Sequence, residues 1–188
     1  LQNGNPIGEI KNLWTKTQKN RIVKNSFRKF TDLNSLPCPD WSVFDSRHLF
    51  RPFEGKVYRG SFVTSSRGCP GSCTYCVNMT IRNLFKGSGN YFRKANSKTF
   101  VSHLRRLKGE YGATWFKFAD DTFLLRSTRE LIEFKEGIKP LNIMFGCSVQ
   151  PGTIDKEKVL LAREMGCVAM TVGIETGNES LRWKILNR

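Results

Sequence analysis

The chain has 188 residues, and its 31 lysines and arginines outnumber its 16 aspartates and glutamates, which gives a formal net charge of +15. Hydrophobic residues make up 39% of the chain, enough for a sizeable core, and this excludes a disordered tail or a low-complexity linker. No stretch approaches 18 uninterrupted apolar residues, so the sequence predicts no membrane-spanning helix.

The first 60 residues or so differ from the rest in their pattern. Short strand-like runs at 9–15 and 21–24 flank a polar turn, which predicts a β-hairpin. Prolines recur from Pro37 to Pro52, and we expect a linker there with little regular structure. The sequence starts at Leu1 without the charged stretch and apolar core of a signal peptide, and we expect it to begin inside a longer protein.

Strand-like and helix-like segments alternate from about residue 60 onward. The strand-like runs lie at 61–65, 114–119, 141–147 and 168–174. The last three begin at a constant interval of 27 residues, with helical patterns of apolar residues between them. Strand, helix and strand at this spacing predict βαβ units, and therefore a parallel sheet with right-handed crossovers.

The helices between these strands carry recognisable end signals. Ser127 and Glu130 form a capping-box pair at the start of the second helix, and Gly166 follows the third. Residues 77–85 predict an extra helix in the first, longer interval. A further helix starting near Asn178 runs to the end of the sequence, so we expect the chain to stop inside a longer protein. Four βα units make a partial barrel or an open sheet, because a closed barrel needs about 250 residues.

One stretch between the first two strands is unusually basic. Residues 81–108 contain eight lysines and arginines and no acidic residue. Such a balance is found in proteins that bind nucleic acid or anionic membranes. No nucleic-acid-binding module accompanies it, so we favour a solvated surface, keep a nucleic-acid partner as the less favoured alternative, and predict no membrane partner.

The strongest chemical signal is a group of three cysteines on the loop after the first strand. Cys69, Cys73 and Cys76 have C-x3-C-x2-C spacing. Three thiolates on one loop can hold three corners of an iron–sulfur cube, whose full set would be four cysteines. The missing fourth ligand leaves one iron with an open coordination position, as catalytic zinc sites do for their substrate.

Three other interpretations of these cysteines are less favoured. A structural zinc site needs a fourth ligand, but His48 and His103 are distant in the sequence and lack zinc-finger spacing. A ferredoxin-like electron carrier needs a fourth cysteine, but Cys147 and Cys167 lie within strand-like sequence. A disulfide with one free thiol is the third. We expect Cys38, Cys147 and Cys167 to be small buried residues.

Polar residues follow the other three predicted strands where each strand ends. Asp120 and Asp121 follow the second, Ser148 and Gln150 the third, and Glu175 the fourth. The carboxyl ends of parallel strands meet at one rim, where βα folds build their active sites. We therefore expect these side chains to converge on a pocket beside the three-cysteine loop.

The three-cysteine motif, with Tyr75 directly before its last cysteine, resembles that of the radical S-adenosylmethionine (radical SAM) superfamily. Further segments resemble the subfamily that carries a cobalamin-binding domain upstream, and they lie at 36–45, 52–58, 119–123 and 172–179. This resemblance implies an α/β fold, a partial (β/α) TIM-like barrel of radical SAM type, truncated after about four βα units and preceded by the hairpin and linker. Residues 1–59 would end a cobalamin-binding-like domain and form the linker, and 60–188 would begin the radical SAM core.

The resemblance also implies cofactors and the residues that hold them. Cys69, Cys73 and Cys76 would bind a [4Fe–4S] cluster, whose open iron would take the amino and carboxylate groups of S-adenosylmethionine (SAM). The implied SAM contacts are Tyr75 for the adenine, Asp120 and Asp121 for the methionine amino group, Glu175 for the ribose or amino-acid end, and Ser148 and Gln150 at the third strand. Many relatives place an arginine where Gln150 stands, so the candidate partner of the SAM carboxylate is Arg182 or a residue outside this sequence.

The implied reaction is the reductive cleavage of SAM to a 5′-deoxyadenosyl radical, for which no catalytic acid or base is predicted. With cobalamin bound upstream, methyl transfer or a radical rearrangement on a small or unknown substrate would follow, in the cytoplasm, with an electron donor such as flavodoxin or ferredoxin. One alternative is a methylthiotransferase-like enzyme acting on tRNA or protein. Another is a non-catalytic iron–sulfur or electron-transfer module.

Overall fold

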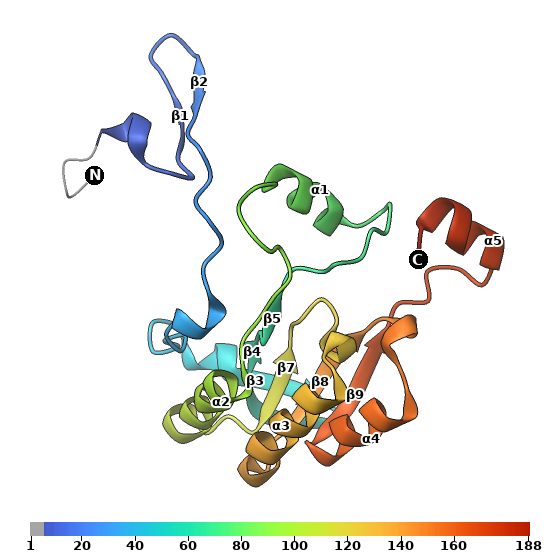
Figure 1. The fold of residues 1–188 in the computed structure, drawn as a ribbon. Coiled ribbons are helices and arrows are strands. Elements are labelled where there is room, and N and C mark those ends of the chain that lie inside the picture. Colours follow the sequence, from blue (N-terminus) through green and yellow to red (C-terminus); the bar gives the residue numbers. More distant parts are fainter. Residues whose placement is uncertain (1–5) are drawn as a thin grey trace.

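The computed structural model describes residues 6–188, and its centre is a five-stranded sheet in the order β3-β4-β7-β8-β9 (Figure 1). The last four strands are parallel, and β3 pairs antiparallel with β4 at one edge. The strands are β3 (Phe50–Phe53), β4 (Lys56–Val63), β7 (Trp115–Phe118), β8 (Met144–Val149) and β9 (Cys167–Val172). This confirms the predicted parallel α/β architecture.

Three helices cover one face of this sheet, as Figure 1 shows. They are α2 (Ser97–Tyr111), α3 (Thr128–Ile138) and α4 (Lys156–Glu164). The predicted capping box of Ser127 and Glu130 starts α3, and Gly166 has the left-handed φ of 101° expected after α4. Each helix therefore begins or ends where the sequence supplies a residue that satisfies its free backbone groups.

Phenylalanine rings fill the space between the helices and the sheet. Phe118 of β7 and Phe145 of β8 stack with ring centroids 4.0 Å apart, and Phe100 of α2 meets Phe118 edge-on at 5.0 Å. All three side chains are at most 1% exposed. Burial of one such side chain contributes roughly 1.5–3 kcal/mol, so this core fixes the strand ends that carry the polar residues.

The strand boundaries differ from the prediction in two places. The strand predicted at 141–147 begins only at Met144, because Pro140 lies in a 3-10 turn and Asn142 is left-handed with φ 47°. The first strand begins earlier than predicted, at Lys56, and pairs with β3, which we had assigned to the irregular linker. Pro52 fits in β3 because an edge strand needs no hydrogen bond from every backbone nitrogen.

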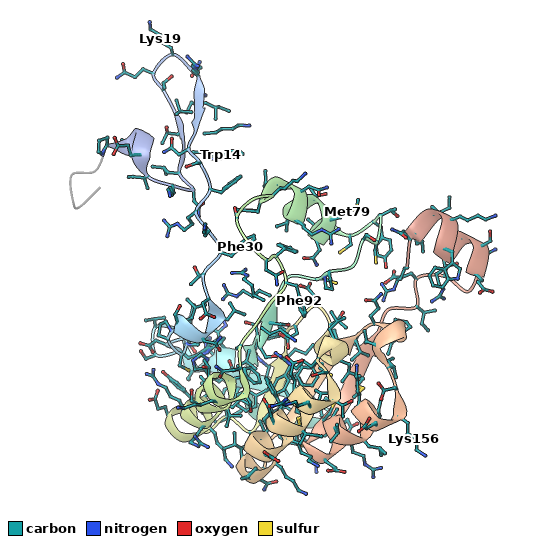
Figure 2. The ribbon with its side chains drawn as sticks, viewed as in Figure 1. Trp14, Lys19, Phe30, Met79, Phe92 and Lys156 are labelled. Carbon is teal, nitrogen blue, oxygen red and sulfur yellow. The ribbon has the colours of Figure 1, made fainter. Side chains whose placement is uncertain are left out.

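The predicted N-terminal hairpin is present and stands apart from the main sheet in Figure 1. It consists of β1 (Trp14–Lys16) and β2 (Ile22–Lys24). The chain that follows packs on the loop after helix α1 (Val77–Leu84), where the ring centroids of Phe27 and Phe30 lie 4.3 and 5.7 Å from that of Phe85. Figure 2 shows Phe30 on this connection between the hairpin and the sheet.

Two shorter features complete the chain. A small antiparallel ribbon pairs β5 (Ser66–Arg67) with β6 (Arg93–Lys94). The helix predicted from Asn178 appears as α5 (Glu179–Leu181) continued by a π-helical turn over Arg182–Leu186. Within residues 6–188, every helix is too short or too polar to span a bilayer.

Candidate functional site

The three-cysteine loop connects β5 to α1 and is held by groups other than its thiols. The guanidinium of Arg82 on α1 donates hydrogen bonds to the carbonyl oxygens of Pro70 at 2.8 Å and Gly71 at 3.3 Å. The backbone nitrogen of Cys76 donates to the carbonyl oxygen of Cys73 at 3.1 Å. The loop therefore keeps its shape while all three thiols stay free to bind a ligand.

Two glycines make the tight path of this loop sterically feasible. A β-carbon on Gly71 would lie 3.3 Å from the sulfur of Cys69 and 3.9 Å from that of Cys73, so both sulfurs face the hollow at this glycine. Gly68 has φ 83°, and a β-carbon there would meet the carbonyl oxygen of Tyr91 at 2.5 Å. A larger residue at Gly68 would therefore change the path of the loop, and one at Gly71 would crowd the sulfur of Cys69.

Within the described residues, the three cysteines do not form a site for a single metal ion. Among residues 6–188, no three histidine, cysteine or acidic side chains converge closely enough to hold one metal ion. A mononuclear zinc site needs such convergence, whereas in an iron–sulfur cube each thiolate binds a different iron. The loop presents three free, half-buried thiols, the kind of donor that iron–sulfur clusters take.

The environment of Cys69 combines burial with hydrogen bonding. Burial raises the pKa of its thiol, and the backbone N–H of Gly71, which donates to the sulfur at 3.4 Å, opposes this change. That hydrogen bond favours the thiolate, the form that binds iron.

A cavity of about 220 Å³ lies between the cysteine loop and the carboxyl ends of the strands. All three cysteines line it, and so do five of the six residues predicted to contact SAM: Tyr75, Asp121, Ser148, Gln150 and Glu175. The structure thus brings together, from four separate strand ends, the side chains that the sequence pattern placed at one rim.

Asp120 is the exception among the six, because it does not line this cavity. Its side chain is 2% exposed and accepts hydrogen bonds from the backbone nitrogens of Ser65 and Ser66 and from the Ser65 hydroxyl, at 2.8, 2.5 and 2.5 Å. Arg126 binds the same serine, through its carbonyl oxygen and its hydroxyl, both at 2.8 Å. Burial raises the pKa of Asp120, and these hydrogen bonds and Arg126 oppose it. Asp120 therefore anchors the base of the cysteine loop.

Sequence reasoning missed Asn78, which orients the neighbouring Asp121. The side-chain nitrogen of Asn78 donates to the carboxylate of Asp121 at 2.9 Å, and the Asn78 oxygen accepts from the Tyr91 hydroxyl at 2.6 Å. Asn78 stands in the first turn of α1, two residues after Cys76, so its position next to the motif was a usable signal. This chain of hydrogen bonds links the cysteine loop to the strand-end carboxylate.

Arg188 was also missed, and it lines the cavity, whereas Arg182 does not. Its guanidinium forms an ion pair with Glu175 at 3.0 Å, donates to the Gly173 carbonyl oxygen at 2.9 Å and hydrogen bonds the Tyr75 hydroxyl. Arg182 instead donates to the carbonyl oxygen of Thr176 and does not line the cavity that the cysteines share. The cavity therefore contains one guanidinium among its described lining residues, that of Arg188.

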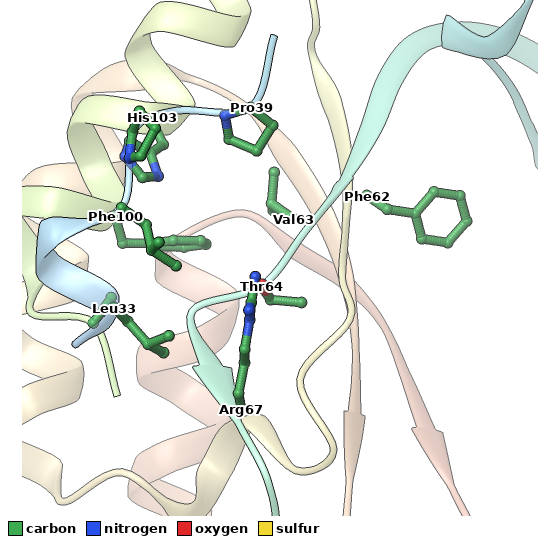
Figure 3. A pocket seen from close by; sticks show the side chains of 11 residues that line it. Leu33, Pro39, Phe62, Val63, Thr64, Arg67, Phe100 and His103 are labelled. Carbon is green, nitrogen blue, oxygen red and sulfur yellow. The ribbon is translucent and has the colours of Figure 1, made fainter. Parts of the chain in front are cut away.

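A second cavity, of about 150 Å³, lies away from the cysteines, beneath the linker (Figure 3). Leu33 and Pro39 of the linker close it against Phe100 and His103 of α2. His103 is partly buried here, and this burial lowers the pKa of its imidazole. This cavity contains none of the predicted site residues, and it shows that the linker is packed onto the core.

Of the remaining cysteines, which we expected to be buried, Cys147 is buried and Cys38 and Cys167 are half-buried. Cys147 on β8 is fully buried, and its sulfur lies 3.9 Å from that of Cys167 on β9. This neighbouring sulfur and burial raise the pKa of the Cys147 thiol. Cys38 is half-buried beside α2. None of the three lines the cavity at the cysteine loop.

Comparison with known proteins agrees with this geometry. A sequence model of the radical SAM superfamily matches residues 63–188. Among curated proteins, an uncharacterized methyltransferase of Pyrococcus horikoshii is 28% identical over 117 residues, which cover 62% of this chain and 24% of that protein. The bacteriochlorophyllide d C-12(1)-methyltransferase of Chlorobaculum tepidum is 24% identical over 182 residues, covering 93% and 38%. The chain thus spans about a quarter to two fifths of these relatives.

Solved structures share the fold at low sequence identity. The radical SAM methyltransferase TsrM from Kitasatospora setae, with cobalamin and a [4Fe–4S] cluster bound, superposes with a TM-score of 0.62 at 16% identity, covering 96% of this chain and 36% of that one. A second structure of TsrM, with tryptophan substrate and a SAM analogue bound, gives the same TM-score and identity. At this identity the likeness establishes the common architecture.

Proposed function

The chain belongs to the radical SAM superfamily, and from this premise we propose that it begins the catalytic domain of an enzyme that cleaves SAM reductively with a [4Fe–4S] cluster. The observation that carries the proposal is the shared cavity, in which three free thiols face polar side chains from the ends of neighbouring parallel strands. Such convergence at the carboxyl ends of strands is where βα folds place their chemistry.

The cysteine loop would hold the cluster through Cys69, Cys73 and Cys76. When bound, the cluster supplies one electron to the sulfonium of SAM and offers its fourth iron to the amino-acid end of that cofactor. Gly71 keeps the space between two of the sulfurs empty, and Arg82 holds the loop from outside through its carbonyl groups.

The rim residues would bind and orient SAM. We assign the methionine ammonium to the carboxylate of Asp121, which Asn78 already orients, because a carboxylate and an ammonium form a charge-assisted hydrogen bond. Arg188 is the cation available for the SAM carboxylate. Tyr75 would lie against the adenine, and Glu175 would reach the ribose. Ser148 and Gln150 complete the wall on β8.

We further propose that the whole protein is a cobalamin-dependent methyltransferase acting on a small molecule. The names of the curated relatives support methyl transfer, and the TsrM structures support a cobalamin domain and a small-molecule substrate. Residues 1–59 would then form the end of that domain and the linker, and 60–188 the start of the radical SAM core. We assign no residue among 6–188 to cobalamin. A small reducing protein would supply the electron that reduces the cluster.

The test uses the full-length protein, reconstituted anaerobically with iron and sulfide. We expect about four irons per chain, a visible-spectrum change when SAM is added to the reduced protein, and conversion of SAM to 5′-deoxyadenosine or S-adenosylhomocysteine. Cys73→Ser should lose the cluster and every SAM-derived product. Cys38→Ser, which removes a cysteine outside the loop, should keep both. A wild-type cluster that neither responds to SAM nor consumes it would leave an iron–sulfur module without this activity.

A further inference from the structure

The face of the sheet opposite the helices carries a lysine ammonium beside the candidate site. Along β7, Phe116 and Phe118 are fully buried against the helices, so the alternating residues Trp115 and Lys117 project from the other face, where both are half-buried. A charged side chain on the inner wall of a βα fold is costly unless it serves a ligand or a partner.

The position of Lys117 places its charge at the edge of the cysteine cavity. Its register partners on the next two strands are small, first Gly146 on β8 and then Ala169 on β9, so the lysine side chain can reach across both. The Lys117 Nζ lies 3.5 Å from the hydroxyl oxygen of Thr171 on β9. Thr171 itself lines the cavity that the three cysteines share.

This ammonium has no opposing charge within residues 6–188, where no carboxylate oxygen lies within 4.0 Å of it. The nearby rim carboxylates are engaged elsewhere, Asp121 by Asn78 and Glu175 by Arg188. A second cation approaches the same face, because the guanidinium carbon of Arg51 lies 4.9 Å from the centre of the Phe62 ring. The Nε atom of Arg51 is buried and has no hydrogen-bond partner among these residues.

An exposed aromatic ring stands directly beside Lys117. Phe62 on β4 is its register partner and is 52% exposed. Phe62 is among the residues that line the cavity beneath the linker, and Figure 3 shows its ring on the side of β4 opposite to Val63. The ring stands over β4 and the ammonium reaches β9, and neighbouring strands are about 4.8 Å apart, so a ligand that contacts both must extend across the strands between them.

We propose that Lys117 anchors a carboxylate of the substrate, while Phe62 packs against an apolar or aromatic part of the same molecule. This inference rests on the proposed function and adds a substrate class to it, namely a small carboxylic acid with an apolar body. The ammonium would hold the carboxylate at the edge of the cavity, next to Thr171, and the apolar part of the substrate would extend toward Phe62. Lys117 is then a specificity residue and takes no part in the cleavage of SAM.

The experiment measures binding of 3-phenylpropanoate and of its uncharged amide to the full-length protein with its cluster reconstituted, by titration calorimetry. We expect the wild type to bind the carboxylate roughly tenfold more tightly than the amide, because a charge-assisted pair forms with one and not with the other. Lys117→Met should reduce this preference to less than about twofold, and Lys117→Arg should retain most of it. The matched control is Lys156→Met on α4, which lies on the outer helical layer in Figure 2 and should leave the preference unchanged.

Three results would overturn the inference. The first is a wild-type protein that does not bind 3-phenylpropanoate, and the second is a wild-type protein that binds the acid and the amide equally. The third is a Lys117→Met variant that binds SAM more weakly and keeps the wild-type preference for the acid. The wild-type comparison stands even where a variant fails to fold. Because binding of the probe needs neither an electron nor cleavage of SAM, failure of the radical SAM activity and failure of the carboxylate site are distinguished.

Discussion

Two adjacent aspartates at the end of β7 have opposite surroundings. Asp120 is buried and accepts hydrogen bonds from Ser65 and Ser66, whereas Asp121 is exposed in the cavity and is contacted by Asn78. Both residues lie just beyond the end of β7, where the chain bends at Asp121, and the two carboxylates point to different surroundings. Their roles differ accordingly, one holding the loop and the other open to a ligand.

Substituting each aspartate by asparagine should separate these roles. Asp120→Asn places an amide against three donors and removes the charge opposite Arg126, so we expect a loss of about 1–3 kcal/mol in the free energy of unfolding. Asp121→Asn should leave thermal unfolding unchanged and weaken SAM binding roughly tenfold, through loss of one charge-assisted hydrogen bond. Thermal denaturation and SAM titration on both variants check this, and a stability loss in Asp121→Asn alone would contradict the assignment.

The sequence predicted those parts of the site that depend on residues close together along the chain. The spacing of the cysteines and the polar residues after each strand are visible along the chain, so the loop and its rim could be anticipated. The inward turn of Asp120 depends on serine donors from another strand, and the approach of Arg188 depends on left-handed residues at Glu175 and Asn187, with φ 63° and 49°. Lys117 escaped notice because a lysine within an aromatic strand has no motif of its own.

At the level of elements, helix α2 meets helix α3 through a glycine. A β-carbon on Gly137 of α3 would lie 2.6 Å from a methyl group of Val101 on α2. Gly109 of α2, in contrast, faces solvent and has nothing within 4 Å of the same position. The first glycine permits close packing of two helices, and the second has no packing role that the structure shows.

The same substitution should therefore have opposite effects at these two positions. Gly109→Ala should stabilise the protein by about 0.5–1 kcal/mol, because alanine has the higher helix propensity. Gly137→Ala should destabilise it by about 1–3 kcal/mol, because the added methyl group forces Val101 or the helix to move. Denaturant unfolding of both variants measures the two effects, and equal shifts of the same sign would contradict this packing.

Proline was misjudged in both of the elements that were predicted incorrectly. The linker prolines suggested irregular structure, yet an edge strand tolerates proline, and Pro52 lies in β3. The strand at 141–147 was placed three residues early because its apolar residues continue the pattern, while Pro140 and the left-handed Asn142 delay its start. The helices were predicted well, since their caps and apolar spacing are encoded within each segment.

On the scale of the whole molecule, an aromatic cluster connects the N-terminal hairpin to the cysteine-bearing half. Phe27 and Phe30 pack on Phe85, and the backbone nitrogen of Phe30 donates to the carbonyl oxygen of Ser88 at 2.9 Å. These few contacts connect the hairpin to the loop after α1. The linker contacts α2 separately, around the second cavity, which residues of both segments line.

Phe85→Ala should release this connection without unfolding the sheet. We expect trypsin to cleave after Arg28 and Lys29 roughly tenfold faster, because these exposed residues lie between the two rings that lose their partner. Phe44→Ala is the matched control, since that ring is 55% exposed and lies outside the cluster. Cleavage followed by mass spectrometry gives the rates, and an unchanged rate in Phe85→Ala would show that other contacts hold the hairpin.

The anchoring of the cysteine loop has a consequence for the order in which the active protein is assembled. The carboxylate of Asp120, the short ribbon of β5 and β6, and the grip of Arg82 all act without sulfur. Removal of iron with a chelator should thus leave a folded apoprotein rather than an unfolded chain. During maturation, a preassembled iron–sulfur cluster would then be inserted into an apoprotein that is already folded. A cluster damaged by oxygen could be replaced without refolding the protein.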